Sequence, residues 1–273
     1  MKITTSRRFI KCLILTTFSF LLFSSLKSND KKNYLSTDSK IKIIVIDAGH
    51  GGKDGSTRGA FSTEKAVALE VSLKLGKAIE KNLPDVKVIY TRTDDSYPQL
   101  YERIKLANRE KADIFISIHC NSMPHNMKGR SLVRGTETFV AGHNRLGEQD
   151  VAIRENASIL LEKDYKDNYD GFDPNDPESY IIFSLMKNAF RDQSIRLASL
   201  VQEEFKKSGR VDRGVKEQGL AVLQRAGMPA ILTEIGFISN PEEEKYMNSE
   251  AGQAEIVNNI LTAITRYKKQ VDN

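Results

Sequence analysis

Three short apolar segments of this chain each end in a side chain that can bind a metal or carry a proton. They are Ile43–His50, Ile114–His119 and Ala230–Glu234, and the first passes through a glycine-rich turn before its histidine. Apolar runs of this length, bounded by turns, are typical of strands buried in a parallel sheet. Because α/β sheets bind ligands at the carboxyl ends of their strands, we expect the three side chains to meet in one site.

Segments with helical spacing separate these strands. Glu64–Lys81, for example, carries apolar residues at the spacing of an amphipathic helix. The other expected helices are Tyr97–Glu110, Arg145–Lys163, Tyr180–Lys207 and Ala251–Tyr267, and the expected strands include Val86–Tyr90, Asp113–His119, Thr136–Val140 and Ala230–Ile235, the last followed by a short turn from Pro241. This alternation predicts a single α/β domain over residues 41–270, with a largely parallel, twisted sheet covered by helices on both faces.

The first 28 residues have the pattern of a secretory signal peptide. Four basic residues and no acid precede the apolar run Cys12–Leu26, which is the order of a basic and then an apolar region in such peptides. The alternative is a membrane anchor, but the run is shorter than the roughly 20 residues that a spanning helix needs. We therefore expect cleavage, no stable membrane anchor afterwards, and a polar linker over residues 29–40 before the domain.

Charge and cysteine content exclude two classes of protein. The chain has a net charge of +5, and residues 1–28 hold five basic and no acidic residues, so the remainder is neutral. A neutral domain lacks the basic surface of a nucleic-acid-binding protein. Only Cys120 remains after cleavage, so no intrachain disulfide framework is expected. Strand alternation places Cys120 opposite His119, as a core thiol rather than a ligand.

The residue types at the strand ends fit zinc chemistry. Two histidines and a carboxylate can hold a catalytic zinc that keeps a fourth position for water, and a further carboxylate can act as general base. His50 could also be an ordinary histidine in an anion-binding turn, and Glu64 an acid favoured by a helix dipole. Glu234 is harder to explain structurally, because a charge within an apolar strand is costly without a partner.

An ordered set of motifs resembles the zinc-dependent N-acetylmuramoyl-L-alanine amidases of the type-3 family, over Lys42–Tyr267. The motifs are Val45-Ile-Asp-Ala-Gly-His50-Gly-Gly, Glu64 at a helix start, Tyr90-Thr-Arg-Thr-Asp94, Ile116-Ser-Ile-His119-Cys-Asn121, Gly135-Thr-Glu-Thr-Phe139 and Thr233-Glu-Ile-Gly-Phe-Ile-Ser-Asn240. The resemblance implies that His50, Glu64 and His119 bind one Zn²⁺ per chain and that Glu234 is catalytic. Asn121, on the same strand face as His119, is a candidate substrate-binding residue.

The same resemblance implies the substrate and the compartment. The reaction would be hydrolysis of the amide between N-acetylmuramic acid and L-alanine in peptidoglycan, during cell-wall remodelling or daughter-cell separation. Secretion to the periplasm or the extracellular cell envelope agrees with that substrate. Two other interpretations remain: a zinc peptidase that acts on the stem peptide, and a non-catalytic peptidoglycan-binding domain.

The interval 143–190 is longer than the minimal enzyme of the resembled family requires, and the resemblance suggests a regulatory helical insertion. It contains a helical segment with Glu155 and Glu162, each a candidate occupant of the fourth position on zinc, and then a loop rich in Asp, Asn, Gly and Pro. Longer members of the family use such an insertion to cover the zinc until an activator protein displaces it, and the resemblance suggests the same here. The alternative is a lid that shapes the substrate groove without inhibiting.

Overall fold

The computed structural model describes residues 41–142, 150–163, 165–169, 171–173, 176, 178–179 and 188–273. The expected signal peptide (1–28) and linker (29–40) lie outside the described residues, and so does part of the expected insertion. In the part of the chain that is described, no helix is long and apolar enough to cross a membrane.

The described strands form one six-stranded sheet in the order β2-β1-β3-β6-β4-β5. The strands are β1 (Ile43–Ala48), β2 (Lys87–Tyr90), β3 (Ile114–Asn121), β4 (Thr136–Ala141), β5 (Asp212–Gln218) and β6 (Ala230–Phe237). β1 pairs in parallel with β2 and β3, β3 with β6, and β4 with β5, whereas β4 runs antiparallel to β6. The prediction of a single α/β domain with a largely parallel sheet is therefore confirmed.

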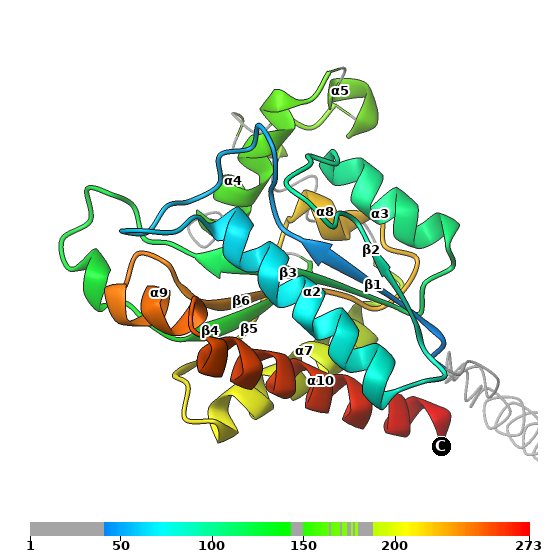
Figure 1. Cartoon of the computed structure of the whole chain (residues 1–273). Coiled ribbons are helices and arrows are strands. Elements are labelled where there is room, and N and C mark those ends of the chain that lie inside the picture. The colour runs from blue at the N-terminus through cyan, green and yellow to red at the C-terminus, as the bar shows by residue number, and fades with distance from the viewer. Residues whose placement is uncertain are drawn as a thin grey trace, which may run out of the picture. The chain divides into compact units, whose positions relative to one another are not determined.

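Helices cover both faces of the sheet, as expected (Figure 1). One layer consists of α2 (Glu64–Asn82), α7 (Arg191–Lys207) and α10 (Glu250–Asp272), and the other contains α3 (Leu100–Arg109) and α8 (Ala221–Gln224). Successive residues of a strand face opposite layers, so Ile44 and Ile46 of β1 pack in the first core and Val45 in the second. All three are fully buried.

Side-chain caps fix the N-terminal starts of the last two helices. The expected turn at Pro241 is a helix, α9 (Pro241–Met247), in which the Asn240 side chain accepts hydrogen bonds from two backbone N–H groups of the first turn. An amide cap followed by proline at the first helical position is a strong helix start. Ser249 caps α10 in the same way, and that helix runs beyond the predicted end at Tyr267.

The predicted helix Arg145–Lys163 is α-helical over only part of the described residues 150–163, and residues 145–149 lie outside the described residues. The described α-helix is α4 (Asp150–Asn156), which continues as the 3-10 helix η3 (Ala157–Leu161), and a single turn, α5 (Tyr165–Asn168), follows. The Asn156 side chain donates to the Gly219 carbonyl and accepts from the Ala221 N–H. This tertiary anchor lies at the point where the α-helix tightens, a conformation common at helix ends.

Two further differences concern the start of a helix and an edge strand. For the predicted helix Tyr180–Lys207, the described helical residues begin at Arg191, and residues 180–187 lie outside the described residues. Strand β5 was not predicted, because Asp212–Gln218 is charged and only partly buried. Such sequences suit an edge strand, whose outer side faces solvent.

Candidate active site

Three elements deliver the predicted metal-binding side chains to one buried cluster. His50 follows β1, Glu64 is the first residue of α2, and His119 lies in β3. His50 Nε2 and His119 Nδ1 lie 3.1 and 3.0 Å from Glu64 Oε1, and the carboxylate is fully buried. The two imidazole rings meet edge to face, with centroids 4.8 Å apart. The structure thus brings together residues that are 14 to 69 positions apart in the sequence.

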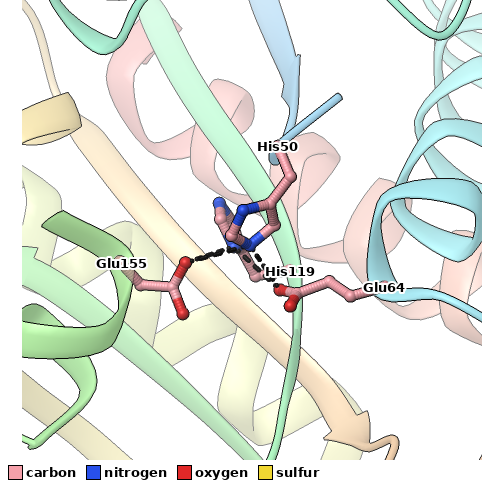
Figure 2. A group of neighbouring side chains, drawn as sticks. All are labelled: His50, Glu64, His119 and Glu155. Atoms are coloured by element: carbon pink, nitrogen blue, oxygen red, sulfur yellow. Dashed lines mark hydrogen bonds and ion pairs between the residues drawn. The ribbon is translucent and has the colours of Figure 1, made fainter. Parts of the chain in front are cut away.

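The fourth member of the cluster is Glu155, from α4 in the insertion. Its Oε2 lies 3.1 Å from His50 Nε2 and 3.0 Å from His119 Nδ1. Figure 2 shows the carboxylate approaching the two rings from the side opposite Glu64. One donor atom from each of the four residues lies within 4.8 Å of every other.

Some donor atoms of this cluster have no hydrogen bond. His50 Nε2 and Glu155 Oε2 are buried without a partner of hydrogen-bond geometry, although the two atoms are 3.1 Å apart. Buried lone pairs left unused are rare in folded proteins. By contrast, His50 Nδ1 lies 2.8 Å from Asp54 Oδ2, which orients the ring and leaves Nε2 directed into the cluster. The two imidazoles and two carboxylates supply nitrogen and oxygen donors of the kinds that bind zinc.

The cluster also perturbs the acid–base behaviour of its members. Burial opposes the charged form of His119, but the neighbouring Glu155 and Glu64 carboxylates raise its pKa to about 9. Burial likewise opposes ionisation of Glu155, but His119 and Arg154 hold its pKa well below the usual range. The metal-free cluster therefore favours protonated histidine beside ionised glutamate, and a metal must displace those protons.

Glu234 lies beside the cluster and is paired with an arginine of the insertion. Glu234 in β6 is the register partner of His119 in the neighbouring strand β3. Its Oε1 accepts a hydrogen bond of 2.9 Å from Arg154 Nη2. Its Oε2 is buried without a partner. Burial raises the pKa of Glu234 well above its usual value, although Arg154 opposes the shift. The carboxyl is therefore placed to hold and release a proton.

Asn121 is held by residues that sequence reasoning missed. Its Oδ1 accepts from Arg154 Nη1 at 3.0 Å, and its Nδ2 donates to the buried carboxylate of Glu137 in β4. Glu137 in turn forms ion pairs with Arg213 and Lys216 of β5. A charge within an apolar strand was the available signal for Glu137, the same signal that singled out Glu234.

The structure places Glu162, the other candidate occupant, away from this cluster. Its carboxylate accepts from the Leu100 N–H at 2.8 Å and from the Tyr169 hydroxyl at 2.7 Å. Glu162 thus connects η3 to the start of α3. Of the two candidate glutamates, Glu155 alone faces the predicted metal ligands.

A groove lies beside Arg154 and Asn121. Its volume is about 1340 Å³, and its lining includes Asn121, Glu137 and Arg154, with Arg58, Met123 and Lys216 farther along. Arg154, which donates to Glu234, thus lines the groove, whereas none of the four cluster residues does.

Comparison with known proteins agrees with this geometry. The model of a family described as N-acetylmuramoyl-L-alanine amidase matches residues 44–266. N-acetylmuramoyl-L-alanine amidase AmiC of Escherichia coli is 31% identical over 229 residues, which are 82% of this chain and 52% of that protein. The chain thus spans about half the length of that relative.

Two solved structures have the same fold. The N-acetylmuramoyl-L-alanine amidase of Clostridium difficile 630 is 28% identical, with a TM-score of 0.62, over 84% of this chain and 97% of that one. The CwlD amidase from Clostridioides difficile, solved in complex with the GerS lipoprotein, is 25% identical, with a TM-score of 0.57, over 84% of this chain and 99% of that one.

Proposed function

Because the chain belongs to the N-acetylmuramoyl-L-alanine amidase family, we propose that it hydrolyses the amide between N-acetylmuramic acid and L-alanine in peptidoglycan. The observation that carries the proposal is the buried cluster of His50, Glu64, His119 and Glu155 with Glu234 beside it. Cell-wall remodelling or daughter-cell separation is the process that we propose for this activity.

We propose that His50, Glu64 and His119 hold one zinc ion per chain. Their nitrogen and oxygen donors match a catalytic site with three protein ligands and one further position. When bound, the zinc supplies Lewis acidity that activates water at neutral pH. Asp54 supports the site by accepting the Nδ1 proton of His50, which fixes the tautomer that presents Nε2 to the metal.

Glu234 is the proposed general base. Its Oε2 has no competing hydrogen bond, so it can accept a proton from the attacking water and return it to the leaving amine of L-alanine. Asn121 is the proposed substrate-binding residue. Its Oδ1, which now accepts from Arg154, would accept a substrate N–H once that arginine leaves.

We propose that the described arrangement is the restrained state of the enzyme. Glu155 faces the histidine nitrogens that would bind zinc, and Arg154 neutralises the proposed base. Two neighbouring residues of α4 thereby oppose both metal activation and proton transfer. A partner protein that binds only the open state would shift the population toward activity. The complex between the CwlD amidase and the GerS lipoprotein supports such a partner, because it shows that a protein of this fold binds a second protein.

The cellular location remains a proposal from the sequence. We propose that residues 1–28 direct secretion and are removed, so that the enzyme acts in the periplasm or the extracellular cell envelope. The intact mass of the protein recovered from the producing cells tests this: loss of the first 28 residues is expected, and a mass that includes Met1 would contradict it.

Digestion of purified sacculi tests the activity. Zinc-loaded protein, and its Glu155→Gln variant to relieve the proposed restraint, should release peptides that begin with L-alanine and leave glycan with free lactyl carboxyl groups. Mass spectrometry identifies both products. A stem-peptide hydrolase would instead leave L-alanine on the glycan, and a binding domain would release neither product. Protein treated with a chelator is the control, and it should be inactive.

A further inference from the structure

Two buried arginines bind the backbone of the segment that carries His50. Arg92 follows β2 in the Thr-Arg-Thr-Asp motif, and Arg103 lies in α3; they are 4% and 1% exposed. Together they donate to three consecutive carbonyls, those of Ala48, Gly49 and His50. Neither arginine belongs to the metal cluster, and the motif that contains Arg92 has no role in the proposed reaction.

Arg92 connects two of the metal-binding segments. Its Nε donates to Ala48 O at 2.9 Å and its Nη2 to Gly49 O at 2.7 Å, beside His50. The same Nη2 donates to Lys65 O at 2.8 Å, in the residue after Glu64. Among the described residues, Arg92 forms no ion pair with a carboxylate, so its buried charge is satisfied by carbonyls.

Arg103 holds His50 itself. Its Nη2 donates to the His50 carbonyl at 2.8 Å, and its Nη1 donates both to Ala48 O at 2.8 Å and to Asp47 Oδ1 at 2.9 Å. The side chain of Asp47 is 1% exposed, so this ion pair is buried directly behind the turn. Ala48 O therefore accepts from both arginines.

The turn has a conformation that needs such support. His50 has a φ of 58°, in the left-handed region that is unfavourable for a residue with a Cβ. Gly49 lies against the His119 ring, where a Cβ would come within 2.4 Å of Nε2. The Gly49 N–H donates to Ile118 O at 3.0 Å. Strand β3, which carries His119, is thus hydrogen-bonded to the same turn.

We propose that Arg92 and Arg103 are positioning residues of the metal centre, which hold the backbone at residues 48–50 and 65 so that His50 and Glu64 meet the metal in a preformed arrangement. A planar guanidinium suits this role, because its donors can bind several carbonyls at once, whereas a lysine ammonium is a single point charge. Preorganisation of this kind raises metal affinity by reducing the ordering that binding must impose. This inference rests on the proposed zinc site.

Zinc affinity measured by chelator competition tests the proposal. Arg92→Lys keeps the charge but not the fork of donors, and its zinc Kd should rise by about 10- to 100-fold, the usual effect of removing a residue that supports a metal ligand. Arg92→Met should show at least the same loss. The absorption spectrum of the cobalt-substituted protein should also change, because the spectrum reports the geometry of the ligands rather than the stability of the fold.

Lys268→Met is the matched control. Lys268 is a largely buried cation of α10 that donates to the Ile41 carbonyl, away from the cluster. The Lys268→Met substitution should lower thermal stability and leave the zinc Kd and the cobalt spectrum unchanged. A wild-type Kd in folded Arg92→Lys, or an equal loss in Lys268→Met, overturns the positioning role. Failure of the wild-type protein to bind zinc would instead refute the proposed function.

Discussion

Arg154 Nη2 donates to Glu234 Oε1 at 2.9 Å, and the two residues are 80 positions apart in the sequence. This contact joins the insertion to the carboxylate that we propose as general base. Because the adjacent Glu155 faces both histidines, the same turn of α4 engages the metal donors and the base. We therefore expect both restraint and catalysis to depend on this one short helix.

Glu155→Gln should raise the basal amidase rate. The neutral amide keeps the size of the side chain but loses its charge-assisted contacts with the metal centre, and a rise of about tenfold corresponds to the loss of one such contact. The rate of peptide release from sacculi measures the effect. Asp167→Asn, an exposed carboxylate of α5, is the control and should leave the rate unchanged. An unaltered rate in folded, zinc-loaded Glu155→Gln would favour a lid that only shapes the groove.

Glu234→Gln should abolish most of the turnover while zinc stays bound. Removing a general base lowers the rate by roughly 10²- to 10⁴-fold, and the amide fits the same buried position beside His119. Elemental analysis should still give one zinc per chain. Near-normal turnover would assign proton transfer to another group.

His119→Ala should lose both zinc and activity. The substitution removes one of the three proposed ligands and leaves His50 with only carboxylates beside it, a donor set unlike those of catalytic zinc sites. Elemental analysis after dialysis measures retention. Cys120→Ala, at the next residue and in the opposite core, is the control and should keep the metal. Stoichiometric zinc in His119→Ala would remove this residue from the site.

Asp47 should make the stability of the fold depend on pH in the acid range. Burial opposes ionisation of Asp47, but Arg103 and the Ser117 and Thr91 hydroxyls outweigh it and lower the pKa. A carboxyl with a lowered folded-state pKa stabilises the fold above its unfolded pKa, about 3.9, and loses that contribution as pH falls through the folded value.

Urea unfolding of wild type and Asp47→Asn, with chelator present, measures this contribution. Breaking a buried ion pair costs about 3–5 kcal/mol, so the variant should be less stable by that amount near neutral pH. The difference between the two proteins should shrink below about pH 4, as Asp47 in the wild type becomes protonated. A difference that does not change with pH would assign the effect to packing alone.

The sequence was sufficient for the parts of the site that have local signals. Apolar strands that end in His50, His119 and Glu234 are recognisable because strand burial and the following turn depend on neighbouring residues. The prediction that these ends converge is confirmed by the sheet, in which β1, β3 and β6 are adjacent. Side-chain alternation likewise placed the Cys120 thiol in the core.

Tertiary structure decided the features that depend on residues distant in the sequence. The pairing of Arg154 with Glu234, the choice of Glu155 over Glu162, and the antiparallel contact of β4 with β6 have no local signature. The charged edge strand β5 forms because β4 offers a free edge beside it. Periodicity and turn chemistry act over a few residues, so the sequence alone determined which elements form and what their ends carry. Close packing of those elements determined which side chains meet, because a contact energy depends on distance in space and not on separation along the chain.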